Sequence, residues 1–329
     1  MSICSACFNP ELIYQIRFDG VHNTSFIPQL LNYLRREKAL IEAQAEVVHL
    51  KEHALLDLID FCRDHMDLEY IFFRVDNQDW KPLIEAQAVY ENQWIDDIIR
   101  EGQVTSYFQP IVNQEEQVVA YELLSRFYGQ DGNLRSPGEV FKAAKKRNRL
   151  YAIDRLCRMT AVRNSARINV MAFINFLPTS IYSPSHCLQS TIRLAEELGV
   201  KPTNLVFEVV ESEKVDDIEH LKSILTYYKK QGFQYALDDV GEGFSTIELL
   251  RELSPGYMKL DMKYVHGVAS DSMKQLMAKR LLKAAQEIGS VPLAEGIETR
   301  EDFLWLRDVG FELFQGYLFG KPLPQPLPS

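Results

Sequence analysis

The stretch Phe233-Gln-Tyr-Ala-Leu-Asp-Asp-Val-Gly-Glu-Gly-Phe-Ser245 decides how the rest of this chain is interpreted. A short apolar run ends in two adjacent carboxylates, Asp238 and Asp239, and two glycines and a serine follow. This pattern is typical of a strand, an acidic loop and a helix that begins near residue 246. Neighbouring side chains on a strand point to opposite faces, so the aspartates serve different sites unless the strand has ended. The pair is either a solvated acidic turn or a site for a divalent cation.

The composition predicts a soluble globular protein with one large domain and one smaller one. The chain has 329 residues, of which 46% are hydrophobic and 25% charged,. Its net charge of −10 argues against a nucleic-acid partner but not against a small phosphorylated ligand held by metal,. We find no apolar run long enough to span a membrane and no signal-peptide pattern. Five scattered cysteines indicate reduced thiols, so we expect a cytoplasmic protein without a membrane partner,.

The first part of the chain is predicted to be a small, mainly helical module of unknown role, residues 1–85. Apolar residues recur at helical spacing over 25–64, with Ser25 as a candidate cap,. Residues 68–75 are typical of a strand, and 82–100 are helical again. The remainder, 86–329, is predicted to be a second domain.

One metal site in this module stays open at this stage. Cys4 and Cys7 form one closely spaced pair, and Cys62 and His65 form another. Together they offer the four ligands of a structural zinc site. The alternative is a set of unrelated thiols, because Cys and His fall three apart on a helix by chance.

From residue 106 onward strand-like and helical segments alternate. The expected strands are 107–112, 117–124, 170–176, 205–210, 234–237, 257–260, 291–294 and 313–318,. Several helices end at a glycine, namely Gly199, Gly232 and Gly289, and Ser136-Pro-Gly-Glu139 is a capping box,. Eight strands interleaved with helices predict an α/β fold of the (β/α)₈, TIM-like barrel type. Residues 113–117 are too few for a crossover helix, so one strand should run antiparallel in a hairpin.

The ends of the expected strands are rich in oxygen ligands. They carry Gln109, Glu122, Asn175, Glu208, Asp238, Asp239, Lys259, Asp261, Glu295, Glu298 and Gln315. The site of such barrels lies at the carboxyl ends of the strands, and oxygen ligands without His or Cys select Mg²⁺ or Mn²⁺. The carboxylates exceed what one Mg²⁺ uses, which favours two ions and in-line displacement at phosphorus. An enolase-type barrel is the alternative, but it needs a carbon acid facing a base.

Seven short motifs stand at or near the ends of the expected strands. They are Tyr121-Glu-Leu-Leu-Ser-Arg126, Ile174-Asn-Phe176, Phe207-Glu-Val-Val-Glu211, Leu237-Asp-Asp-Val-Gly241, Lys259-Leu-Asp261, Ala294-Glu-Gly-Ile-Glu298 and Gln315-Gly-Tyr317. Together they resemble the motifs of the EAL-domain family, the cyclic di-GMP-specific phosphodiesterases of bacteria. The resemblance covers about residues 95–325 in the family's order and does not reach the N-terminal module. It implies hydrolysis of cyclic di-GMP to linear pGpG, which lowers a bacterial second messenger.

The resemblance also implies a role for each matched residue. The implied metal ligands are Glu122, Asn175, Glu208, Asp238 and Asp239, with Asp238 bridging two Mg²⁺ or Mn²⁺ ions. The implied catalytic residues are Lys259 and Glu295, which position and deprotonate the attacking water, and Glu211, which braces the loop after Asp239. The implied substrate-binding residues are Gln109, Arg126, Glu298 and Gln315. Ca²⁺ is expected to inhibit, and the family suggests a homodimer.

Three departures from the family pattern leave the ligands in place. The signature Glu-Ala-Leu is Glu122-Leu-Leu124, the usual Asn-x-Ser-Pro is Asn175-Phe-Leu-Pro178, and the usual Asp-Asp-Phe-Gly is Asp238-Asp-Val-Gly241. An active phosphodiesterase is therefore the favoured hypothesis. The alternative is a receptor that binds cyclic di-GMP without cutting it and signals through the N-terminal module.

Overall fold

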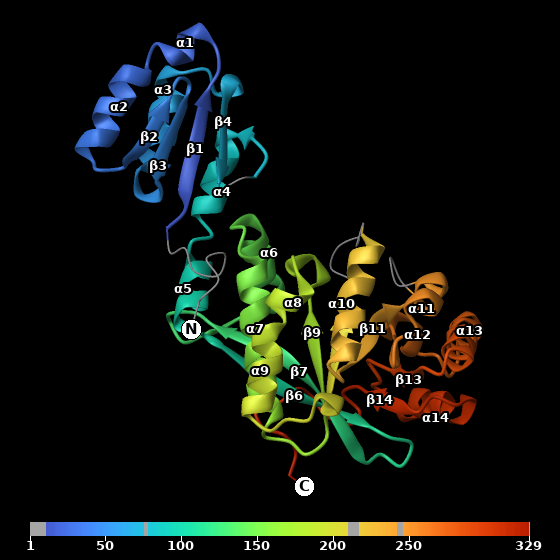
Figure 1. Ribbon diagram of the computed structural model, residues 1–329. Coiled ribbons are helices and arrows are strands. Elements are labelled where there is room, and N and C mark those ends of the chain that lie inside the picture. The colour runs from blue at the N-terminus through green and yellow to red at the C-terminus, as the bar shows by residue number, and fades with distance from the viewer. Residues whose placement is uncertain (1–10, 76–77, 210–216, 242–245, 329) are drawn as a thin grey trace. The chain divides into compact units, whose positions relative to one another are not determined.

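The computed structural model describes residues 11–75, 78–209, 217–241 and 246–328 (Figure 1). It divides into two compact units. Unit 1 comprises Met1–Gly102 and Gly138–Ala152, and unit 2 comprises Gln103–Pro137 and Ile153–Ser329. Within the described ranges, no helix combines the length and the apolar character that a membrane crossing requires.

Unit 2 is a closed barrel of eight strands with one short extra strand. The strands are β6 (Val104–Val112), β7 (Val118–Tyr128), β8 (Leu134–Arg135), β9 (Met171–Phe176), β10 (Leu205–Val209), β11 (Gln234–Val240), β12 (Tyr257–Leu260), β13 (Val291–Ala294) and β14 (Leu313–Gln315). Their order is β6-β14-β13-β12-β11-β10-β9-β7-β8, and pairing of β6 with β7 closes the ring. β6 runs antiparallel to both of its neighbours, β14 and β7. The expected barrel and its antiparallel hairpin strand are thus confirmed.

Helices connect successive parallel strands and lie outside them (Figure 1). They are α7 (Leu150–Ser165), α8 (Pro184–Cys187), α9 (Gln189–Glu197), α10 (Ile218–Lys230), α11 (Ile247–Leu253), α12 (Met262–Val265), α13 (Ser272–Glu287) and α14 (Arg300–Val309). The glycines expected at helix ends follow α9, α10 and α13 with positive φ, as left-handed C-terminal turns require,. The cap of α11 is Thr246, whose side chain accepts from Leu249 N. Ser245, the expected cap, lies outside the described residues.

Unit 1 is built on a five-stranded antiparallel sheet of order β2-β3-β1-β4-β5. The strands are β1 (Ile13–Phe18), β2 (Leu40–Gln44), β3 (Val47–Lys51), β4 (Ile71–Val75) and β5 (Lys81–Pro82). The helices are α1 (Val21–Thr24), α2 (Ile27–Arg36), α3 (Leu55–His65), α4 (Ala86–Tyr90), α5 (Trp94–Glu101) and most of α6 (Pro137–Lys146). The expectation of a mainly helical module was therefore wrong.

The error arose at turns that carry no glycine or proline. The helix expected over 25–64 is α2, then a β2–β3 hairpin, then α3. The chain turns at Lys38 (φ 56°) and Ala45 (φ 49°), two residue types that rarely adopt positive φ,. Ser25 follows α1 and does not cap α2, whose N-cap is Phe26. Cys62 is buried on α3, whereas Cys4 and Cys7 lie outside the described residues, so the zinc site stays a prediction.

A buried guanidinium holds unit 1 together. Arg147 is 1% exposed and donates to Glu52 through both terminal nitrogens, with Nη2 at 2.7 Å from Oε2. Its Nη2 also donates to Asp96 Oδ2 (2.6 Å), and Arg149 Nε donates to the other oxygen of that carboxylate (2.9 Å). Tyr14 on β1 donates to Glu52 Oε1 (3.1 Å). Planar, bidentate geometry of this kind suits arginine and not lysine.

Replacing this arginine should destabilise unit 1. In Arg147→Met the carboxylate of Glu52 loses its buried counter-charge and Asp96 keeps only Arg149, and removal of one partner of a buried pair costs about 3–5 kcal/mol,. Urea denaturation of the full chain measures the change. Arg63→Met is the matched control, because Arg63 pairs with Asp60 at an exposed position,. Equal midpoints for the two variants would contradict the structural role of Arg147.

Candidate active site at the barrel mouth

The site is one layer of side chains inside the barrel. A cluster of buried residues fills the interior, with one member from each strand: Ile111, Ala120, Phe173, Val206, Ala236, Tyr257, Leu293 and Leu313. Side chains on a strand face the same side every second residue. A polar residue lies two positions after each of these cluster residues on the parallel strands, and two positions before the cluster residue on antiparallel β6. These polar residues are Gln109, Glu122, Asn175, Glu208, Asp238, Lys259, Glu295 and Gln315. The strand period therefore delivers eight of the expected site residues to one end of the barrel.

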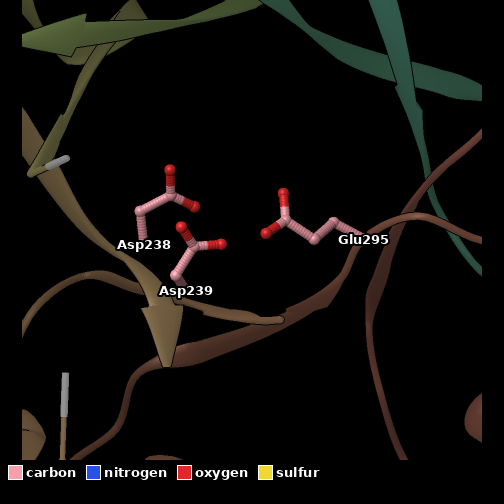
Figure 2. A group of neighbouring side chains, drawn as sticks. All are labelled: Asp238, Asp239 and Glu295. Atoms are coloured by element: carbon pink, nitrogen blue, oxygen red, sulfur yellow. The ribbon is translucent and has the colours of Figure 1, made fainter. Parts of the chain in front are cut away.

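Asp239 joins this layer because β11 contains a bulge. The register between β11 and β12 shifts between Leu237 and Val240, and Asp239 has φ 49°. This left-handed conformation turns its side chain to the same side as that of Asp238. The two neighbouring aspartates can therefore share one site. Oxygens of Asp238, Asp239 and Glu295 lie within 4.8 Å of one another, and Figure 2 shows the three carboxylates facing each other. Burial and the adjacent Asp238 charge raise the pKa of Asp239 to about 6,.

Lys259 is the buried cation of the site. It is 1% exposed, and its Nζ lies 2.8 Å from Asp238 Oδ1, 2.9 Å from Glu208 Oε1 and 3.2 Å from Glu295 Oε2. Glu122 Oε2 is further away, at 3.9 Å. Burial opposes protonation, but these carboxylates outweigh it and raise the pKa of Lys259 well above its ordinary value,. Lys259 is therefore an ammonium in this site.

Glu122 is fixed by two amides. Asn175 Nδ2 donates to its Oε1 (2.7 Å) and Gln315 Nε2 donates to its Oε2 (2.6 Å). Burial opposes ionisation of Glu122, but the Lys259 charge and these hydrogen bonds hold the pKa of Glu122 below its ordinary value. Asn175 turns its nitrogen to Glu122, so its carbonyl oxygen remains available to another ligand.

The site disfavours the charged forms of Glu208 and Glu295. Burial and the charge of Glu122 raise the pKa of Glu208 well above its ordinary value. Burial also raises the pKa of Glu295, because the charges of Asp238 and Glu122 add to it and Lys259 offsets only part. Within the described residues, both oxygens of Glu208 and Oδ1 of Asp238 are buried without a well-aligned hydrogen-bond donor. Buried acceptors in this state fit a cation.

The other expected site residues lie around this layer in different ways. Gln109 is buried on β6 opposite Glu122, where the two strands pair. Arg126, further along β7, donates to the carbonyl of Ser125, and its guanidinium lies over the Tyr107 ring. Glu298 is exposed after β13, and Glu211 lies outside the described residues.

Asp261 has a local role in this structure. Its side chain accepts from Lys263 N (2.6 Å) and caps α12. Lys259 pairs with Glu208 and Asp238, which the sequence places far away, rather than with Asp261 two residues on. Sequence analysis also missed Tyr264, whose hydroxyl donates to the carbonyl of Gly241 (3.0 Å). No spacing rule links those positions, because only the barrel brings them together.

Comparisons with known proteins identify the family of the barrel segment. Residues 92–322 match the EAL domain family. A standalone EAL protein of Vibrio cholerae O395, solved in its c-di-GMP-bound form, is 34% identical and covers 69% of this chain and 94% of its own, with a TM-score of 0.61. Two Escherichia coli K12 relatives are a probable cyclic di-GMP phosphodiesterase, PdeG (28% identical), and the cyclic di-GMP phosphodiesterase PdeR (24%).

The curated relatives are longer than the segment they share with this chain. The match covers 68% of this chain and 46% of PdeG, and 72% of this chain and 37% of PdeR. The matched family segment contains every strand of the barrel and all eight residues of the polar layer. The chain therefore belongs to the EAL domain family.

Proposed function

We propose that this protein hydrolyses one phosphodiester bond of cyclic di-GMP and releases linear pGpG, using two Mg²⁺ or Mn²⁺ ions. The observation that carries this proposal is the intact polar layer, in which every barrel strand supplies the residue that the family pattern requires. The similar Vibrio cholerae protein in its c-di-GMP-bound form supports the choice of ligand.

The charge balance of the site supports two divalent cations. The clustered carboxylates are Glu122, Glu208, Asp238, Asp239 and Glu295. With all five carboxylates ionised, as metal binding requires of its ligands, and Lys259 as an ammonium, four negative charges remain, which two divalent cations would balance. Glu122, Asn175, Glu208 and Asp238 would hold the first ion, and Asp238 and Asp239 would hold the second. Such ions lower the pKa of water and neutralise charge on the phosphoryl oxygens.

The chain's own residues have distinct tasks in the proposed reaction. A water oxygen forms the new bond to phosphorus, the bond from phosphorus to the 3′ oxygen breaks, and that oxygen leaves with a proton. Lys259 cannot be the base, because its carboxylate neighbours keep it protonated,. It instead orients the water and stabilises the charge that develops on phosphate. Glu295, which faces Asp239 and is partly exposed, takes the proton of the water.

The remaining family residues are proposed to handle the substrate. Arg126 contacts a phosphate of the ligand, with its guanidinium already placed by the Tyr107 ring. Gln315 acts indirectly, because its amide is engaged with Glu122 (2.6 Å). Gln109 and Glu298 line the binding region. Glu211 is proposed to brace the segment after Asp239.

Product analysis tests the proposed function directly. Purified protein incubated with cyclic di-GMP and Mg²⁺ or Mn²⁺ should yield pGpG, detected by chromatography. Asp238→Asn should abolish turnover, because the variant loses the carboxylate shared by both ions. If the variant keeps full activity, the two-ion assignment is wrong. If the wild type binds cyclic di-GMP but no metal supports turnover, the protein is a receptor.

Calcium should bind at the site and inhibit. Ca²⁺ takes more ligands at longer distances than Mg²⁺ and misplaces the attacking water. A titration of Ca²⁺ into the Mg²⁺-supported reaction should lower the rate, and excess Mg²⁺ should restore it. Turnover in Ca²⁺ alone at the Mg²⁺ rate would contradict this argument.

Lys259→Met should separate catalysis from binding. We expect turnover with Mg²⁺ to fall by about 10²–10³-fold, the effect of losing one preorganised donor. Binding of cyclic di-GMP in Ca²⁺ should change far less, because metal and Arg126 hold the ground-state phosphate. Since Lys259 is also the counter-charge of Glu208, thermal unfolding in Ca²⁺ must confirm that the variant is folded,. A parallel collapse of binding and turnover would make Lys259 a ground-state ligand.

Asp239→Asn should stabilise the metal-free protein and reduce its response to metal. The substitution removes the negative charge of Asp239, which burial and the adjacent Asp238 charge disfavour,. Thermal unfolding in EDTA should therefore give an equal or higher melting temperature than wild type. Addition of Mn²⁺ should raise the melting temperature of the wild type more than that of the variant. Equal responses to Mn²⁺ would remove Asp239 from the ligand set.

A further inference from the structure

The one-turn helix α12 directly follows the strand that carries Lys259. Asp261 at the junction caps the helix through Lys263 N, and Tyr264 N donates back to the Asp261 carbonyl (3.0 Å). These bonds fix the start of α12 relative to β12. The helix is therefore placed by the same strand that places Lys259.

One side of α12 packs on the exit of the β11 bulge. Gly241 has φ 114°, and a Cβ built there would lie 2.6 Å from Cε2 of Tyr264. The aromatic ring thus rests directly on the glycine, and the hydroxyl donates to its carbonyl (3.0 Å). Gly241 is two residues after Asp239, with buried Val240 between them. Tyr264 consequently fixes the backbone at the point where Asp239 leaves the regular strand.

The same helix packs on the residue after Glu295. Gly296 has φ 73°, and a Cβ there would lie 2.5 Å from Cβ of Met262. The Glu295 amide in turn donates to the carbonyl of Leu260 at the end of β12 (3.4 Å). The position of α12 therefore limits how the Glu295 backbone can approach the barrel mouth.

The far end of α12 is also tied down. Asp302, 3% exposed, accepts from Gly267 N (3.0 Å) and Ala269 N (2.9 Å), and the Thr299 hydroxyl donates to it (2.8 Å). Burial opposes ionisation of Asp302, but these donors hold its pKa below the ordinary value. Hydrogen bonds therefore hold both the start of α12 and the segment that follows it.

We propose that α12 is a brace that sets the spacing of Asp239 and Glu295, and that Tyr264 is the positioning residue for Asp239. The inference rests on the proposed function in so far as these carboxylates serve a divalent cation. Tyr264 is proposed to act through the Gly241 backbone, whose carbonyl accepts from its hydroxyl. Its hydroxyl is the part of the brace that can be removed without disturbing the packing.

The test is Tyr264→Phe, which deletes the hydroxyl and keeps the ring. We expect Mn²⁺ to bind about fivefold more weakly, the equivalent of one neutral hydrogen bond, measured by calorimetry without substrate. The matched control is Tyr235→Phe. The Tyr235 hydroxyl also donates to a backbone carbonyl, that of Leu253 (2.7 Å), but from the beginning of β11. The control should lose similar thermal stability and keep the Mn²⁺ affinity of the wild type.

The outcomes separate the brace from the proposed function. Unchanged Mn²⁺ affinity in Tyr264→Phe, with a melting temperature lowered as in Tyr235→Phe, would reduce the hydroxyl to a structural role and overturn the brace. Absence of Mn²⁺ binding by the wild type would overturn it too. If Tyr264→Phe weakens Mn²⁺ binding while the wild type releases no pGpG, the brace stands and the proposed hydrolysis fails.

Discussion

The buried ammonium of Lys259 is the interaction on which the barrel mouth depends. Taking such a charge out of water costs several kcal/mol unless it is well paired, and Asp238, Glu208 and Glu295 supply that pairing from three other strands,. The pairing is incomplete from the carboxylate side, because the acids outnumber the single cation. The lysine is fully paired with carboxylates, but the carboxylates are not fully paired with cations. The site therefore favours the binding of further positive charge.

The β11 bulge converts a sequence pattern into a site. A regular strand would send Asp238 into the barrel and Asp239 outward. The left-handed conformation of Asp239 costs about 1–3 kcal/mol for a residue that is not glycine,. The fold tolerates this cost because regular pairing with β12 resumes at Val240, which pairs with Leu260 and is fully buried. The bulge is therefore held by the regular strand on both sides. The backbone strain is confined to the bulge, and the bulge places both carboxylates on the same side of the strand.

The sequence was a good guide wherever the structure repeats a simple period. The bounds of β12 and β13 were predicted to the residue, because in each case a mostly apolar run ends at an acidic residue. The polar layer was predicted from the residues at the strand ends. Prediction failed in unit 1, where the chain turns at Lys38 and Ala45, two residue types that are common inside helices. The sequence also could not reveal the contact of Tyr264 with Gly241, because a hydrogen bond from α12 to the residue after β11 depends on the closed barrel and leaves no local pattern.

The two compact units do not correspond to one cut in the sequence. Residues 138–152 lie inside the segment that matches the EAL domain family, yet they fold with unit 1. The reason is Arg147, whose buried guanidinium takes its carboxylates from Glu52 and Asp96. Removal of residues 1–85 would take away Glu52 and leave this arginine with Asp96 and the carbonyl of Val89. The N-terminal sheet is therefore part of the structural environment of the α6–α7 turn, and not an appendage that ends where the family segment begins.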